Sequence, residues 1–238
     1  MKTGFTLAEV LITLGIIGIV AAMTIPNLIS SYQKHVIETR LKEDYSIFTQ
    51  AMRRAQDDEV PFDDNIAQDL SGNKKWFETF VLPYIKTARV CYQQPGCWHK
   101  RGATKNLAGK TIYANNNAIG IGAAPVTTKL TNGSNINFDW YSPPSMKKYF
   151  GIDVKKTAMI IFIDANGDNP PNALGKDIYA IGFIPDKGFV PAGYNESNET
   201  VNNNCSKNNN EINAGYYCLM KVKNNGWEIP NDVWKIKI

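Results

Sequence analysis

The hydrophobic residues of the chain are concentrated in residues 5–25, a nearly continuous apolar run with the sequence FTLAEVLITLGIIGIVAAMTI. A helix that crosses a bilayer needs about 20 such residues. A single carboxylate, Glu9, interrupts the run near its start. A charged group inside a membrane is costly and usually marks a function. The run therefore predicts a membrane-spanning helix in which Glu9 has a specific role.

Beyond Pro26 the apolar residues recur at spacings of three to five, which is typical of an amphipathic helix. This helix is expected to continue to the acidic residues 57–59 and to end before Pro61. Pro26 lacks a backbone N–H, so we expect it to kink or locally melt the helix. A second, shorter helix is predicted over residues 74–85. The apolar positions of the long helix are Tyr32, Val36, Leu41, Tyr45, Phe48, Met52 and Ala55.

From residue 110 the pattern changes to short apolar runs that are typical of β-strands and are separated by Gly, Asn and Pro. The predicted strands are residues 111–114, 118–122, 136–141, 159–163, 178–184 and 216–222. The Asn-rich residues 195–213 are expected to form a surface loop. Helices followed by strands indicate an α+β fold in which an antiparallel sheet packs on the long helix.

The composition narrows the class of protein. A chain of 238 residues with 43% hydrophobic and 20% charged residues contains a packed globular domain, because disordered and multi-span membrane proteins have other compositions. The net charge of +4 is spread along the chain and does not indicate a nucleic-acid partner.

The four cysteines fall into two local pairs, Cys91 with Cys97 and Cys205 with Cys218, and this spacing suits two short disulfide loops. Disulfides imply an oxidising compartment. Zinc bound by Cys91, Cys97 and His99 is an alternative for the first pair. It lacks a fourth ligand and the usual spacing, so a disulfide is favoured.

The first 30 residues resemble the type IV pilin and type II secretion pseudopilin superfamily. Residues 1–4 resemble its short basic leader, residues 5–9 the start of its mature chain, and residues 10–26 its apolar helical spine. The resemblance implies cleavage between Gly4 and Phe5 by prepilin peptidase and N-methylation of the new Phe5 amine. It also implies a pilin-like division into a leader (1–4), a transmembrane assembly helix (5–26) and an extracytoplasmic globular domain (27–238). The Cys205–Cys218 pair resembles the disulfide-bounded region of many pilins.

The function that the resemblance implies is that of a structural subunit of a type IV pilus or a type II secretion pseudopilus. Such a subunit is a single-pass protein of the bacterial inner membrane, and its fibre lies in the periplasm or at the cell surface. Its partners would be identical or related pilin subunits, prepilin peptidase and the inner-membrane assembly platform. After cleavage the Phe5 amine is a buried cation that needs a counter-charge, and Glu9 of a neighbouring subunit can supply it. The alternative is a membrane-tethered extracytoplasmic binding domain, with calcium as one conceivable requirement, that does not polymerise.

A segment rich in oxygen-bearing side chains follows one predicted strand. Its candidate calcium ligands are Asp164, Asn166, Asp168 and Asp177. The EF-hand pattern fails beyond them, because Asn169 and Gly175 stand where that loop needs Gly and Glu. Asn-Gly and Pro-Pro are turn sequences, so a plain turn is favoured over a calcium loop. Some pseudopilins carry a calcium site, which keeps the alternative open.

No catalytic motif is present in the sequence. The chain has two histidines and no G-x-S-x-G, Walker A or G-x-G-x-x-G element. Aromatic and basic residues adjoin at residues 98–101, and stacking aromatics beside cations can bind single-stranded nucleic acid. Core aromatics and solvated lysines explain the same pattern more simply. The sequence therefore predicts a protein that is not an enzyme, that has no cofactor apart from the calcium alternative, and that does not bind nucleic acid.

Overall fold

The computed structural model of the chain describes residues 6–61, 67–112 and 119–238. The chain divides into two compact units, Met1–Val36 and Ile37–Ile238. The predicted cleavage residues Gly4 and Phe5 lie outside the described residues.

The first described element is helix α1 (Leu7–Asp57), which has 51 residues. By length and composition, α1 is the one helix of the described chain that is suited to cross a membrane, and its most apolar 18-residue window has a mean hydropathy of 2.2. The helix continues through Pro26, so the chain does not melt there. Proline removes only one helical hydrogen bond. Nearby, the side chains of Thr24 and Asn27 donate hydrogen bonds to the carbonyls of Val20 and Met23.

The second unit contains a six-stranded sheet in which each strand pairs with its sequence neighbours and all pairs are antiparallel. This arrangement, with the long helix packed against the sheet, confirms the predicted α+β pilin-like fold class. The central strands correspond to the predicted strands 136–141, 159–163 and 178–184. The strands are β1 (Thr87–Tyr92), β2 (Val126–Leu130), β3 (Asn135–Tyr141), β4 (Ala158–Asp164), β5 (Ile178–Ile184) and β6 (Gly188–Pro191).

Several short helices connect and cover the strands. The predicted helix 74–85 is α2 followed by a 3-10 turn, and it begins earlier than expected because Asp69 accepts a hydrogen bond from the Gly72 backbone N–H as an N-cap. The helices after α1 are α2 (Leu70–Phe80), the 3-10 helix η1 (Leu82–Tyr84), α3 (Pro143–Phe150), α4 (Asn198–Asn204), α5 (Cys218–Asn224) and α6 (Asn231–Trp234).

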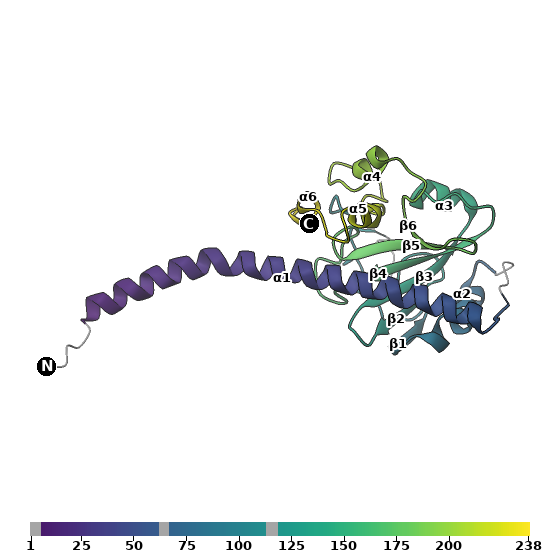
Figure 1. Ribbon diagram of the computed structural model, residues 1–238, viewed down its shortest axis with the longest axis horizontal. Helices are drawn as coiled ribbons and strands as arrows, with labels where there is room; N and C mark the ends of the chain where they lie inside the picture. The colour runs from purple at the N-terminus through teal and green to yellow at the C-terminus, as the bar shows by residue number, and fades with distance from the viewer. Residues whose placement is uncertain (1–5, 62–66, 113–118) are drawn as a thin grey trace. The chain divides into compact units, whose positions relative to one another are not determined.

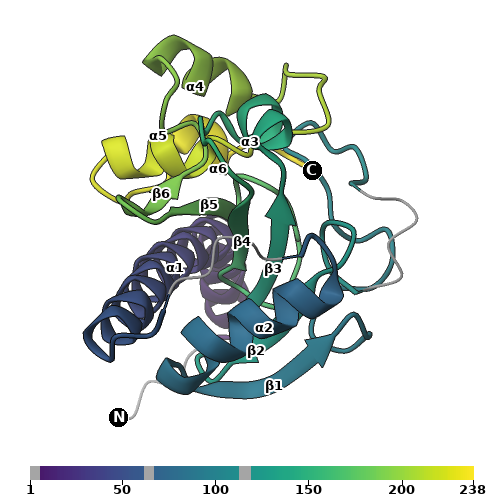
Figure 2. The ribbon, with the colours of Figure 1, turned by 90° about the vertical axis from the view of Figure 1, so that its right-hand side faces the viewer.

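The sheet is buried on both faces, which accounts for the nearly continuous apolar sequence of β4 and β5. On one face, Leu41 and Phe48 of α1 join Trp76 and Phe77 of α2 in one apolar cluster with the sheet. The ring of Phe48 lies 5.7 Å from that of Phe138. Helices α3 and α4 cover the other face. Figure 1 shows the strands beside the later part of α1, and Figure 2 shows α3 and α4 on the opposite side of the sheet from that part.

Three predictions of local structure were wrong. Residues 216–222 were expected to form a strand, but they lead into helix α5, whose residues Leu219 and Val222 are buried in the core. A short apolar run does not distinguish a strand from a buried helix. The expected loop 195–213 contains α4, whose N-cap is Ser197. The described parts of predicted strands 111–114 and 118–122 form no named strand; Thr111 makes an isolated bridge to Lys105.

Strands β1, β2 and β6 were not predicted. Their sequences contain polar or charged residues and a glycine, so their hydrophobic alternation is weak. Strand β1 lies at one edge of the sheet and has a bulge between Thr87 and Arg89. Their pairing depends on the neighbouring strand rather than on their own sequence pattern.

Candidate functional site

The first turn of α1 is closed by its own side chains. The Glu9 carboxylate accepts hydrogen bonds from the backbone N–H and the hydroxyl of Thr6, both at 2.8 Å. The Glu9 backbone N–H donates in return to the Thr6 hydroxyl at 3.3 Å. This reciprocal arrangement is a capping box. It orders the Glu9 carboxylate at the start of the apolar helix.

The apolar side chains that follow Glu9 have no protein surface around them. No residue of the most apolar 18-residue window is buried, and Leu7 is 80% exposed. Outside this helix the described residues expose only two large apolar side chains, Tyr194 and Ile212. An exposed apolar surface of this extent marks a site for membrane or protein contact. The exposed apolar residues include Leu11, Leu14, Ile17, Val20, Ile25 and Ile29.

The globular unit contains a buried polar cluster that the sequence did not reveal. The imidazole Nε2 of His99 contacts a carboxyl oxygen of Asp164, and both residues are less than 5% exposed. The His99 Nδ1 lies 3.1 Å from the Thr104 hydroxyl, which also accepts the Trp98 indole N–H at 3.2 Å. The sequence offers His99 as a zinc ligand but not as a partner of Asp164, because two residues 65 positions apart give no local signal of contact.

Burial controls the protonation of this cluster. Desolvation lowers the pKa of His99 to about 4 and raises the pKa of Asp164 well above its usual range. The arrangement of hydroxyl, imidazole and carboxyl has the order of a nucleophile, base and orienting acid. Thr104, however, is 6% exposed, so a substrate cannot reach its hydroxyl in this conformation. The cluster instead joins the segment after β1 to the end of β4.

The predicted calcium ligands lie in the loop between β4 and β5, where each carboxylate has a donor. Asp177 accepts the backbone N–H groups of Asn172 and Ala173 at 2.8 and 2.6 Å. Asp168 accepts from Lys129 at 2.5 Å and from the Asn135 amide at 2.8 Å. Burial, followed by the neighbouring Asp164, raises the pKa of Asp177 to about 8.

These contacts describe a turn held by its own hydrogen bonds. The Asn166 backbone N–H donates to Asp164, as expected of an Asx turn. The Asn166 side-chain oxygen has no hydrogen-bond partner in the described structure, which leaves one oxygen ligand available. Among the described residues, no group of three or more His, Cys, Asp or Glu side chains is arranged to hold a metal ion. Calcium binding by Asp164, Asn166, Asp168 and Asp177 stays a prediction.

Both predicted disulfides are formed. Cys91 pairs with Cys97, and Cys205 pairs with Cys218. The first pairing confirms the preference for a disulfide over zinc bound by Cys91, Cys97 and His99. Because Cys218 begins helix α5, the second disulfide joins the end of α4 to α5 rather than to a strand.

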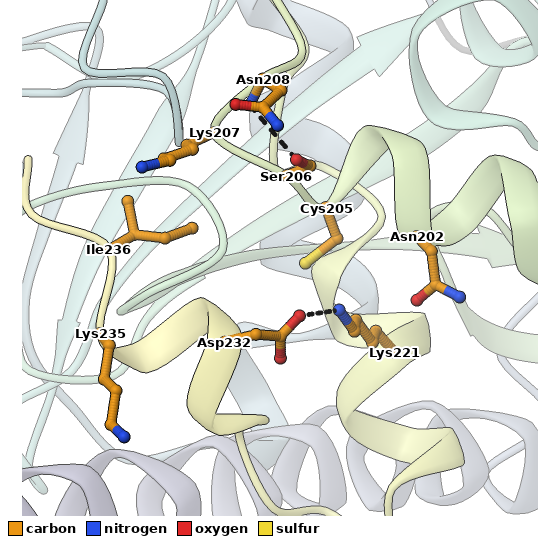
Figure 3. A pocket seen from close by; sticks show the side chains of 9 residues that line it. All are labelled: Asn202, Cys205, Ser206, Lys207, Asn208, Lys221, Asp232, Lys235 and Ile236. Carbon is orange, nitrogen blue, oxygen red and sulfur yellow. Dashed lines mark hydrogen bonds and ion pairs between the residues drawn. The ribbon is translucent and has the colours of Figure 1, made fainter.

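An open hollow lies beside the second disulfide, as Figure 3 shows. Its volume is about 660 Å³. An ion pair between Lys221 and Asp232, 2.6 Å apart, joins its α5 and α6 sides. The remaining charged side chains at its edge, Lys207 and Lys235, are those of exposed surface lysines. The hollow is therefore a polar surface feature.

The comparisons with known proteins divide the chain near Pro26. Residues 1–25 match the prokaryotic N-terminal methylation motif, which is the signal motif of type IV pilins and pseudopilins. Residues 27–235, most of the chain, match a family of unknown function, DUF6613. The chain belongs to the DUF6613 family. The search of curated proteins and the search of solved structures gave no match.

The methylation motif confirms the resemblance of the N-terminus and marks this DUF6613 chain as a type IV pilin-like or pseudopilin subunit. This motif belongs to structural rather than catalytic subunits. Together with α1, it fits a pilin anchored in a membrane. The DUF6613 match covers the segment that contains the sheet, the buried cluster and both disulfides.

Proposed function

We propose that the chain is a structural subunit of a type IV pilus or a type II secretion pseudopilus. It is inserted once in the bacterial inner membrane with the globular domain on the extracytoplasmic side. Prepilin peptidase cleaves it after Gly4, the Phe5 amine is N-methylated, and the assembly platform adds the subunit to a fibre through the N-terminal helix. The leader, helix and globular domain are residues 1–4, 5–26 and 27–238.

The observation that carries this proposal is the exposed apolar surface of α1 behind a single ordered carboxylate. A membrane or neighbouring helices must cover Leu7 and the apolar residues after it, because exposing this apolar surface to water costs much free energy. Helices that pack in lipid associate through close fit and polar contacts, since the apolar side chains are already among apolar tails. Glu9 is the polar contact that the first turn offers.

In the proposed assembly the Phe5 amine of one subunit meets Glu9 of another. The charge pair sets the axial register, and the apolar residues of α1 supply the area of contact. The capping box holds the Glu9 carboxylate with two Thr6 donors before assembly. The Phe5 amine then becomes a third, cationic donor to Glu9. In an apolar setting an unpaired charge is costly, so the two charges are favoured as a pair.

The test is assembly of full-length Glu9 variants in the native host. Glu9→Ala removes both the capping bond and the charge, whereas Glu9→Gln keeps an oxygen for Thr6 and removes only the charge. We expect both variants to be inserted and processed but to form no fibres in sheared fractions or micrographs. Glu43→Ala, which removes an exposed carboxylate farther along α1, is the matched control and should assemble. Normal fibres from both Glu9 variants would overturn the proposed register.

Processing is tested separately by the intact mass and N-terminal sequence of protein from its native membrane. A chain that begins at methylated Phe5 is expected. An intact Met1, or a cut near Ala22, would favour the tethered binding domain that does not polymerise.

A further inference from the structure

The segment after β1 is fastened to the fold at its start by a disulfide. Cys91 is in β1, and its bond to Cys97 closes a short loop that contains Pro95 and Gly96. Gly96 has a φ of 117°, a conformation that side-chain-bearing residues rarely adopt, so the turn depends on glycine. The closed loop fixes the position and direction of the chain at Cys97. His99 follows two residues later.

The same segment is fastened at its other end by backbone hydrogen bonds. The Lys105 N–H donates to the Asn172 carbonyl at 3.0 Å, and the Leu174 N–H donates to the Lys105 carbonyl at 2.9 Å. The Leu107 N–H donates to the Ala214 carbonyl at 3.1 Å. These bonds join the segment to the loop between β4 and β5 and to the chain before α5.

Between the two attachments, three side chains are buried against the opposite face of the sheet from α1. Trp98 belongs to the apolar cluster of that face, and His99 reaches Asp164 at the end of β4. Thr104 holds both rings by its hydroxyl. Asp164 has 0% exposure, so its carboxyl group depends for polar contact on His99 and on the backbone N–H groups of Asn166 and Gly167.

We propose that the Cys91–Cys97 disulfide is a redox-sensitive device that controls whether residues 98–104 dock and whether His99 reaches Asp164. In the oxidised protein the segment begins at a fixed point, and only a few residues lose conformational freedom when His99 binds. In the reduced protein the last attachment before the segment is Gln93, whose backbone N–H donates to the Pro125 carbonyl at 3.2 Å, so docking orders a longer piece of chain. When His99 leaves, the buried Asp164 carboxyl loses its imidazole partner and keeps the Asn166 N–H, so undocking has its own cost in free energy.

The redox step is thiol–disulfide exchange, and because Cys91 and Cys97 are 3% and 0% exposed, a reductant reaches the bond only when the segment opens. A dithiol reductant donates two electrons and two protons, the sulfur–sulfur bond breaks, and Cys91 and Cys97 become thiols while the reductant becomes a disulfide. Coupling between two equilibria is reciprocal. If the disulfide favours docking of His99, then docking of His99 must favour the disulfide by the same factor.

This reciprocity gives a test in the full-length protein in detergent micelles. The protein is equilibrated with increasing ratios of reduced to oxidised dithiothreitol, and each cysteine pair is quantified by differential alkylation and mass spectrometry. His99→Leu removes the contact with Asp164 and keeps an apolar side chain of moderate size. We expect it to lower the dithiothreitol ratio that half-reduces Cys91–Cys97 by about tenfold, within the usual range of coupling.

The Cys205–Cys218 pair is the internal control in the same molecules and should be reduced at an unchanged ratio. His99→Gln, which keeps an N–H donor for Asp164, should restore part of the shift. An unchanged midpoint for Cys91–Cys97 would overturn the proposal. So would an equal shift of both pairs, because it would show that His99 supports the whole domain rather than this segment.

Hydrogen exchange gives a second readout that does not depend on a His99 variant. In Cys91→Ser/Cys97→Ser protein, amides of residues 98–112 and 172–174 should exchange faster than in the oxidised protein, and those of β3 to β5 should not. Cys205→Ser/Cys218→Ser is the matched control and should leave residues 98–104 protected. Equal protection of residues 98–104 in all three proteins, or a loss of protection throughout the sheet, contradicts a local device.

Discussion

His99 and Asp164 form a buried pair although 65 residues separate them in the sequence. Removing His99 leaves a buried carboxyl oxygen of Asp164 without its imidazole partner, although the Asn166 N–H still donates to the other oxygen. Because burial disfavours the charged form of both groups, we predict that His99→Leu lowers the free energy of unfolding by about 2 kcal/mol, the cost of a lost buried hydrogen bond. Urea unfolding of the protein in detergent, followed by tryptophan fluorescence, measures this loss. His35→Leu replaces the other histidine, which is exposed, and should change the value by less than about 0.5 kcal/mol.

Asp44 makes the attachment of α1 to the β2–β3 turn dependent on pH. One of its carboxyl oxygens accepts from Asn132 at 2.8 Å, and the other is buried without a partner in the described structure. Desolvation raises the pKa of Asp44 from 3.8 to about 6. The folded state binds the proton of the Asp44 carboxyl more tightly than the unfolded state does. This protonation therefore stabilises the folded state at low pH, and the stabilisation is lost as the pH rises from about 4 to 6.

Asp44→Asn should therefore remove this part of the pH dependence. The amide carries no charge, and its N–H₂ group can donate to the nearby Ser134 hydroxyl. We predict that the variant is more stable than wild type by about 2 kcal/mol at pH 7.5 and that the difference disappears near pH 4. Thermal melts across this range measure the effect, with exposed Glu43→Gln as the control. A variant that is less stable at pH 7.5 would refute the raised pKa.

Phe48 joins α1 to the sheet by packing alone. Its side chain is fully buried, with its ring 5.7 Å from that of Phe138 and 6.3 Å from that of Phe189. Phe48→Ala removes this contact and leaves a cavity, so we predict a loss of about 3–5 kcal/mol of unfolding free energy. Chemical denaturation measures the loss. Tyr32→Ala on the exposed part of the same helix should have no such effect on the globular unit.

Calcium binding to the loop between β4 and β5 has a direct test. A bound cation would have to replace His99 at Asp164 and Lys129 at Asp168. Because these partners already satisfy the carboxyl groups, we expect the melting temperature to be the same in calcium and in a chelator. A higher melting temperature in calcium, lost in Asn166→Ala, would instead establish the predicted site.

The sequence predicted the parts of the fold that carry a strong local pattern. The apolar run before Pro26 and the periodic residues Leu41 and Phe48 identify α1, and the apolar runs of β3 to β5 identify three strands. Cysteine spacing indicated the two pairs, since each closes a short loop, and the structure supplied their connectivity. These features depend on residues close together in the chain.

The buried polar contacts could not be predicted in the same way. Asp44 interrupts the apolar stripe of α1 and looks like a solvent-facing residue, yet the β2–β3 turn covers it. Asp139 reads as the polar side of a strand, but Asn73 of α2 and the Ala123 N–H both donate to it. Each contact joins segments that meet only after the sheet has formed. Their signal lies in the tertiary arrangement and not in local spacing.

The order of the strands has a consequence for how the chain acquires its structure during synthesis. Every strand hydrogen-bonds to the strand that precedes it in the sequence, from β1 through β6. Each newly made strand therefore finds its partner already present and does not wait for a later segment. Pairings between consecutive strands have a lower sequence separation than pairings between distant strands, which favours faster folding and leaves fewer unpaired strand edges exposed. The sheet can therefore form one strand at a time, in the order in which the strands are synthesised.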